Sequence, residues 1–535
     1  MSTPASSASR YDCILIGGGH NGLVCAAYLA RGGRKVLVLE AASAVGGAAV
    51  TREFAPGFQV SAGAHLLHSM SASIIEDLQL PSHGLSMVAS QMPTTALGGD
   101  GTALTIRAVR LESGAGAATC AATDIESYSG YAALMDRLAD ALHPVLGTVP
   151  PRLGTDRWAD RRALMQLGWR IRRLGRHDMR ELLRIGGMAV HDLLKDNFQT
   201  PLLQGALGFD AVLGTNFGPR SPGSVFTLLY RLAGAAGARS KGSGPDTLTQ
   251  PRGGLGALTA ALAKAAQAAG AEIRTGSPVQ SITVRDYRAA GVVLESGETI
   301  SADAVISNAD PHTTFLRLLG TEHLDAGFVR RVAHLRNQGL SAKLHLALSD
   351  LPKFTGVKPE ALGGRLLIAP TLEYLERAFN HSKYGEYSSS PALEITVPTV
   401  NDPTLAPAGR HVLSAVVQYA PYRLAAGWDS GRQSLTDLVL QMLERYAPGI
   451  GATVTASQLL APPDIEREFR ITGGHWHHAE LALDQFFLVR PLPGVAQYAT
   501  PLDGLYLCGA GCHPGGGVMG AAGRNAARQV LEQAA

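Results

Sequence analysis

The sequence predicts an α/β protein with more than one domain. Three features carry this prediction: a strand–turn–helix–strand unit near the N-terminus, a glycine-rich strand–helix segment near the C-terminus, and strands of alternating polarity between them. The chain has 535 residues, of which 46% are hydrophobic and 17% are charged. This length exceeds what one simple core usually supports, and the composition is that of a folded protein.

The N-terminal unit combines two apolar runs with closely spaced glycines and one acidic residue. In order, it contains an apolar run at 13–16, Gly17, Gly19 and Gly22, a helical pattern at 23–31, an apolar run at 35–39, and Glu40. In a G-x-G-x-x-G turn the first glycine permits the tight turn, the second lets the backbone approach a pyrophosphate, and the third lets the helix pack closely. The helix N-terminus then offers free N–H groups to phosphate.

Glu40 ends the second strand of this unit. A carboxylate at this position accepts a hydrogen bond from a ribose 2′-hydroxyl and repels a 2′-phosphate. The unit therefore predicts FAD or NAD and disfavours NADP. A glycine turn without a ligand is the alternative, but all parts of the unit fall in the required order.

Two further glycine-rich stretches favour FAD. Gly46 and Gly47 follow the first unit closely, which indicates backbone running along a pyrophosphate and a flavin. Residues 504–531 predict a strand at 505–508, two glycine turns, and a helix from Val518 whose N-terminus faces the same ligand.

Together these motifs resemble those of phytoene desaturase-like flavoproteins, in the branch of the pyridine nucleotide-disulphide oxidoreductase domain-containing proteins. This branch belongs to the amine oxidase and glutathione-reductase-type FAD superfamily. Three more stretches resemble it: PRGGLGALTAALAKAAQAAGAEIRTGSPV, ADAVISNADPHTT and GGHWHHAELALDQFFLVRP. The resemblance spans most of the chain and is weakest across residues 100–245. It implies a Rossmann-type FAD-binding domain of the glutathione-reductase type and a discontinuous α+β substrate domain.

The resemblance also implies which residues hold FAD. The expected set is Gly17, Gly19, Gly22 and Glu40 for the ADP half, Gly46 and Gly47 along the pyrophosphate and flavin, Val279 for the adenine, Gly511 for the pyrophosphate and ribityl chain, and Met519 and Gly520 near the flavin ring. Many relatives place an arginine directly after the glycine pair, where this chain has Ala48. No phosphate-binding arginine is therefore assigned.

Both expected domains are discontinuous. The FAD-binding domain is expected at residues 1–70, 245–320 and 490–535. The substrate domain is expected at 71–244 and 321–489, with a helical lid at about 152–200 and a mixed sheet.

Lys343 is a candidate catalytic residue on a predicted strand of the substrate domain. Residues 340–349 alternate apolar and polar side chains, and 392–398 and 410–420 predict further strands of the same sheet. In amine oxidases of the superfamily, a lysine on a comparable strand holds a water against flavin N5. The resemblance thus implies that Lys343 orients a water or relays a proton; a lysine that faces solvent is the alternative.

Histidines supply the other candidate catalytic groups. Residues 473–480 contain His475, His477 and His478, and His513 lies near the C-terminal glycines. By family position, His478 or His513 could act as an acid or base, whereas a hydrogen bond that fixes the ring or the loop is the favoured alternative. No second ligand cluster accompanies these histidines, so no metal site is predicted.

Residues 152–184 carry ten arginines among tryptophans and aliphatic residues. An amphipathic helix of this kind can lie on an anionic membrane surface. A lid whose arginines face solvent is the favoured alternative. Peripheral membrane contact therefore stays open.

The net charge and the cysteines of the chain indicate which partners and which cellular location to expect. With 47 basic and 44 acidic residues, the net charge of +3 does not indicate a nucleic-acid partner. We find no signal-peptide pattern and no apolar run of the ~18 residues that a membrane-spanning helix needs. Five scattered cysteines indicate reduced thiols and a cytoplasmic location. The nearest pair, Cys508 and Cys512, is expected to pack rather than to act as a redox pair.

These features lead us to expect an FAD-dependent oxidoreductase that dehydrogenates or isomerises a hydrophobic, polyene-like or lipid-like substrate in an apolar tunnel, by hydride transfer to FAD. Because no second dinucleotide motif follows a strand, electrons are expected to pass to oxygen, a quinone or another acceptor. A flavin amine oxidase and a non-catalytic flavin-binding regulatory or interaction protein are the alternatives.

Overall fold

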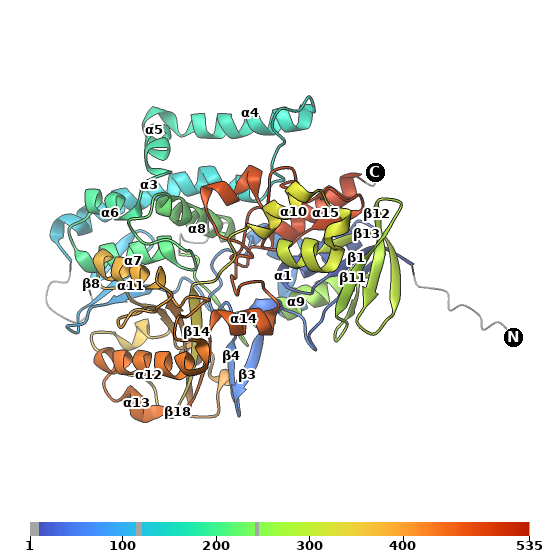
Figure 1. The fold of residues 1–535 in the computed structure, drawn as a ribbon. Coiled ribbons are helices and arrows are strands. Elements are labelled where there is room, and N and C mark those ends of the chain that lie inside the picture. The colour runs from blue at the N-terminus through green and yellow to red at the C-terminus, as the bar shows by residue number, and fades with distance from the viewer. Residues whose placement is uncertain (1–9, 114–119, 241–245, 534–535) are drawn as a thin grey trace.

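Two β-sheets organise the computed structural model, which describes residues 10–113, 120–240 and 246–533 (Figure 1). In Figure 1 the first sheet lies on the side of the two chain ends, among α1, α9, α10 and α15. The second sheet lies on the other side, with α12 and α13 below it and α3 to α8 above it.

Within the described residues, seven strands form the first sheet in the order β10-β2-β1-β13-β12-β11, with β19 pairing the end of β13. β1 runs parallel to β2 and β13, and β11, β12 and β13 form an antiparallel meander. The strands are β1 (Arg10–Ile16), β2 (Val36–Leu39), β10 (Glu272–Arg274), β11 (Val279–Arg285), β12 (Arg288–Leu294), β13 (Thr299–Ser307) and β19 (Leu505–Leu507). This topology confirms the predicted Rossmann-type unit and the C-terminal strand.

The two ends of the chain pack against each other beside this sheet. A Cβ added to Gly523 in α15 would lie 2.1 Å from the carbonyl oxygen of Asn21 in α1, so glycine permits this close approach. The C-terminal helix begins at Ala521 rather than at Val518, because Val518 and Gly520 have positive φ values of 57° and 73°. The helices here are α1 (His20–Arg31), α9 (Leu255–Ala268), α10 (Ala326–Ala333) and α15 (Ala521–Gln533).

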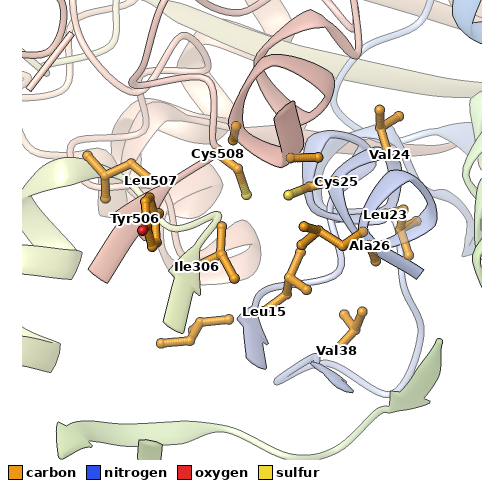
Figure 2. Close-up of a cluster of buried hydrophobic side chains, with 14 of the residues drawn as sticks. Leu15, Leu23, Val24, Cys25, Ala26, Val38, Ile306, Tyr506, Leu507 and Cys508 are labelled. Atoms are coloured by element: carbon orange, nitrogen blue, oxygen red, sulfur yellow. The ribbon is translucent and has the colours of Figure 1, made fainter. Parts of the chain in front are cut away.

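Buried aliphatic side chains join β1, β2, β13 and α1 into one core, and Figure 2 shows the thiols of Cys25 and Cys508 side by side within it. The sequence indicated Cys512 as the nearest partner of Cys508, but the structure gives that place to Cys25. Burial raises the pKa of the Cys508 thiol well above its ordinary value, and Cys25 hydrogen-bonds it. Every cysteine in the chain is described, and all are buried and free.

The second sheet, in the part of the chain that is described, has the order β18-β14-β17-β16-β15-β6-β7-β8. Its strands are β6 (Thr94–Leu97), β7 (Ala103–Arg107), β8 (Arg110–Ser113), β14 (Ser341–Leu348), β15 (Arg365–Ile368), β16 (Ala392–Thr396), β17 (His411–Gln418) and β18 (Val454–Leu460). The three strands predicted near 340–349, 392–398 and 410–420 are thereby confirmed as members of one sheet. Two small antiparallel pairs complete the strands: β3 (Thr51–Ala55) with β4 (Phe58–Ser61), and β5 (Met87–Ala89) with β9 (Gln250–Pro251).

Helices cover both faces of the second sheet. One face packs its aliphatic residues against α12, and the other faces α7, α8 and α11. The remaining helices are α2 (Ala72–Asp77), α3 (Ala122–Leu146), α4 (Trp158–Arg173), α5 (Gly175–Ile185), α6 (Val190–Asn197), α7 (Pro201–Val212), α8 (Ser224–Ala238), α11 (Leu372–Ser382), α12 (Trp428–Tyr446), α13 (Ile450–Thr453) and α14 (Pro462–Phe469).

The arginine-rich segment forms α4 and α5, which lie at the edge of the molecule beyond α3 (Figure 1). No residue of α4 is buried. Of the helices in the described residues, none has both the length and the apolarity to cross a bilayer.

Candidate active site

A cavity extends from the N-terminal glycine turn to the second sheet. Most of the residues that the resemblance assigned to FAD lie on its wall. These are Gly17, Gly19, Glu40, Gly46, Gly47, Val279 and Met519.

The two glycine motifs form one cradle at the start of α1. The Gly46 N–H donates to the carbonyl of Gly18 at 2.9 Å. A Cβ on Gly19 would lie 2.8 Å from Asn308 Nδ2, so a side chain there would have to displace the Asn308 amide. α1 begins after Gly19 without a side-chain cap. Its first N–H groups are thus available to a phosphate, and the cradle fits the pyrophosphate of FAD.

The carboxylate of Glu40 is held at the cavity wall by backbone. It accepts hydrogen bonds from the N–H groups of Gly18 at 2.7 Å and Ala42 at 2.8 Å. A carboxylate has about four acceptor sites, so these two bonds leave capacity for a ribose hydroxyl.

Four predicted site residues lie outside the cavity lining: Gly22, Gly511, Gly520 and His513. Gly22 serves helix packing, since a Cβ there would meet the Gly17 carbonyl oxygen at 2.3 Å. The Nε2 atom of His513 bonds the carbonyl of Val145 at 2.9 Å, which ties the C-terminal turn to α3. Ala510, Gly516 and Gly517 line the cavity from that turn instead.

Lys343 lies on the cavity wall formed by the second sheet. It pairs with Val416, which pairs with Glu394 on the next strand, so the three side chains share one sheet face. Lys343 is 1% exposed, and its Nζ has no hydrogen-bond partner among the described residues. Burial lowers the pKa of Lys343 well below its ordinary value, although Glu394 opposes this. The alternative of a solvent-facing lysine is therefore wrong.

A buried ionic network surrounds Glu394. His65 Nε2 lies 2.8 Å from its Oε1, and Arg365 donates to its Oε2. Arg365 also donates to Asp210 at 2.5 Å, and Arg231 Nε pairs with the same carboxylate at 3.2 Å. The cavity is thus not a purely apolar tunnel, because Asp210, Arg231, His65 and Glu394 all line it.

Burial and charge fix the protonation states of this network. Burial favours the neutral carboxyl at Glu394, but Arg365 and His65 overcome it and hold the Glu394 pKa well below its usual range. Burial lowers the pKa of His65 to about 4 and that of His68 well below its ordinary value. At neutral pH the network therefore contains an ionised Glu394 and neutral histidines.

The histidine loop reaches the cavity through His477 and His478. Burial lowers the pKa of His478 to about 4 and that of His477 well below its ordinary value. Arg490 is fully buried and donates to carbonyls of this loop and of the C-terminal turn, including those of His477 and Ala510. Among the residues that the structure describes, no cluster of His, Cys, Asp or Glu could hold a metal.

Sequence reasoning missed the ionic network. A weak signal exists in two strands, because Glu394 is the sole charged residue of ALEIT and Arg365 that of RLLI. A charge inside an otherwise apolar strand indicates a buried partner. Asp210, Arg231 and His65 carry no comparable local signal.

A family model described as flavin containing amine oxidoreductase matches residues 22–531. The chain belongs to this family. Members bind FAD, and this chain is accordingly an FAD-dependent oxidoreductase with the α/β fold that its sequence predicted. The match also agrees with the resemblance to phytoene desaturase-like proteins.

Three relatives of this flavin oxidoreductase cover different shares of the chain. Pyridine nucleotide-disulfide oxidoreductase domain-containing protein 2 of Mus musculus is 37% identical over 98% of this chain and 93% of its own. A limonene dehydrogenase component of Castellaniella defragrans is 26% identical over 98% of this chain and 95% of its own. The neurosporene-forming phytoene desaturase of Cereibacter sphaeroides is 30% identical over 51% of each chain.

A solved structure of putrescine oxidase shares the fold of this flavin oxidoreductase. Its TM-score is 0.61 at 15% identity, and the match covers 98% of this chain and 99% of that one.

Proposed function

We propose that this oxidoreductase dehydrogenates or isomerises a hydrophobic, polyene-like or lipid-like substrate. The observation that carries the proposal is the continuity of one cavity from the FAD cradle to Lys343, with Leu66, Leu213 and Trp476 along its wall. Such an apolar surface suits a hydrocarbon body. The names of two relatives, a limonene dehydrogenase component and a phytoene desaturase, favour the same substrate class.

We propose different chemical roles for the cofactor and for the protein. Bound FAD supplies a hydride acceptor. The protein excludes water and orients the substrate, and we assign Lys343 to hold a water or relay a proton, because its amine is buried, has no hydrogen-bond partner among the described residues, and has a pKa well below its ordinary value. His478 lines the cavity with a lowered pKa, and its Nδ1 is buried without a hydrogen-bond partner among the described residues, so we assign it a hydrogen bond that would fix the flavin ring rather than acid–base work. FAD itself is held by the cavity-lining glycines, Glu40, Val279 and Met519.

The domain assignment belongs to the same proposal. Residues 1–70, 245–320 and 490–535 contain every strand of the first sheet that is described and would form the FAD-binding domain. Residues 71–244 and 321–489 contain the second sheet and would form the substrate domain.

Anaerobic reduction of the flavin tests this function. The purified holoenzyme is mixed with a panel of terpenes and polyenes, and with a matched panel of primary amines, and flavin absorbance is followed. We expect bleaching by members of the apolar panel and a loss of about 100-fold or more in rate for Lys343→Met with FAD content unchanged. Bleaching by amines alone would establish the amine oxidase alternative. Absence of bleaching by any compound, with intact photoreduction, would establish a non-catalytic flavin protein.

We also propose that a cytoplasmic form of the protein contacts membranes through α4. Trp158, Met165 and Trp169 are 68%, 55% and 60% exposed. Their spacing of seven and four residues places them in one stripe along the helix. By helical spacing Arg161 and Arg172 lie on one side of this stripe and Arg162 and Arg173 on the other, which is the arrangement of an interfacial helix on anionic lipid.

Vesicle co-sedimentation tests the membrane contact. Binding to phosphatidylserine-containing vesicles is expected to exceed binding to neutral phosphatidylcholine vesicles and to fall on Trp158→Ser with Trp169→Ser. Tyr287→Ser is the matched control, because Tyr287 is 92% exposed on the turn between β11 and β12. Equal sedimentation of the double variant and the control would refute the assignment.

A further inference from the structure

The cavity wall formed by the second sheet and its neighbouring helices carries a cluster of ionisable groups. Helix α8 contributes Thr227, Tyr230 and Arg231, which share one helix face by their spacing, and all three line the cavity. The strands contribute Lys343 and Glu394. The other lining members of the cluster are His65, His68 and Asp210.

Both carboxylates of this cluster already have cationic partners. Glu394 accepts from Arg365 and contacts His65, while Asp210 accepts from Arg365 and pairs with Arg231. Two carboxylates thus face two guanidinium groups, and each carboxylate is paired. Neither carboxylate is left to attract a further cation.

The cationic side of the cluster, by contrast, has unused capacity. The ion pair of Arg231 with Asp210 is made through Nε, and 18% of the Arg231 side chain stays exposed where it lines the cavity. The Lys343 Nζ is buried without a hydrogen-bond partner in the described part of the chain. Guanidinium donors and an amine that can take up a proton therefore face the same space.

The charge of the ligand's head group determines which ligands this part of the cavity can bind. An ammonium group would add a positive charge beside Arg231 and Lys343 and would find no free carboxylate, which costs free energy in a buried site. A carboxylate would pair with the planar Arg231 fork and would favour protonation of Lys343, giving a compensated pair.

We propose that the substrate is an amphiphile with an apolar body and a carboxylate head group, which Arg231 binds with Lys343 beside it. This inference rests on the proposed function, since it names the substrate class of that same cavity. The apolar body would lie along Leu66, Leu213 and Trp476, and the head group at the ionic wall.

Titration calorimetry on the holoenzyme tests the head-group preference without turnover. The probes are linoleic acid, methyl linoleate and linoleylamine, which differ only in the head group. We expect the acid to bind more tightly than the amine. Arg231→Gln should weaken binding of the acid by about tenfold to 100-fold and leave the ester within about twofold. Arg220→Gln is the control, because Arg220 makes a surface pair with Glu373.

Proton uptake on binding is a second measurement. It would not differ between the variants if the cluster served only to stabilise the fold. Binding of the acid, measured in buffers of different ionisation enthalpy, should take up more protons in the wild type than in Lys343→Met. Tighter binding of the amine than of the acid by the wild-type protein would overturn the proposal, as would an equal weakening of acid and ester in Arg231→Gln. Preferential acid binding with a flavin that no polyene reduces would instead overturn the proposed oxidation and leave the binding site standing.

Discussion

Replacing Glu394 by glutamine tests whether the ionic network also holds the second sheet to its helices. Glutamine keeps the shape of the side chain and removes its charge. The Glu394 and Arg365 side chains are 6% and 2% exposed, so the lost interaction is a buried one. Removing one partner of a buried pair costs about 3–5 kcal/mol. Because Asp210 still pairs with Arg365, we expect a loss at the lower end, about 3 kcal/mol in the free energy of unfolding.

The assay is guanidinium denaturation with saturating FAD, followed by circular dichroism and tryptophan fluorescence. Glu386→Gln is the matched control: it removes the same charge from a carboxylate that is 61% exposed and pairs with His381 at the surface. That control should change the free energy of unfolding by no more than about 0.5 kcal/mol. If the two variants unfold at the same denaturant concentration, the network does not stabilise the fold and our reasoning about it is refuted.

Three further perturbations probe the cradle, the buried histidines and the histidine loop. Gly22→Ala places a Cβ against the Gly17 carbonyl, so it should cost about 1–3 kcal/mol of stability and lower the ratio of flavin to protein absorbance. Gly168→Ala is the control and should change neither quantity, because a Cβ at Gly168 in α4 meets no other atom. Equal flavin content in the two variants would contradict the packing role of Gly22. In the native protein His65 and His478 have a pKa of about 4, whereas in the unfolded chain both histidines take up a proton near pH 6.5. The free energy of unfolding should therefore fall by about 3 kcal/mol per histidine between pH 6.5 and 4. A flat profile from denaturation at several pH values would refute this. In Arg490→Lys the side chain has too few donors for the carbonyls that Arg490 binds, so limited proteolysis should cut residues 473–490 faster than in the wild type. An unchanged digestion pattern would show that Arg490 does not hold this loop in place.

The FAD cradle was predictable because its requirements are local. A tight turn, a close helix and an approaching phosphate each demand glycine at a fixed spacing, so Gly17, Gly19 and Gly22 identify the unit without knowledge of the rest of the chain. The carboxylate of Glu40 follows from the same unit. The start of the last helix was missed by three residues, because positive φ values at Val518 and Gly520 depend on contacts that the local pattern does not encode.

The ionic network could not be predicted because its members are distant in sequence. Asp210, Arg231, Arg365 and Glu394 come from two helices and two strands, and only the pairing of β15 with β16 brings the last two together. Alternation on the strand at 340–349 correctly separated a polar from an apolar side. It could not tell whether the polar side of Lys343 meets solvent or a covered cavity, since helices far along the chain supply the cover.

The burial of this network also separates a site from an ordinary core. The opposite face of the same sheet packs aliphatic residues against α12, which shows that these strands can bury an apolar face. Paired charges in a buried position are often no more stable than apolar residues of similar volume. A wall that only had to be stable would therefore not need Arg365 between two carboxylates. Asp210 and Glu394 line the cavity, and Arg365 joins the helix and the strand that carry them. The arrangement of these charges is therefore better explained by what the cavity binds than by the packing of the sheet.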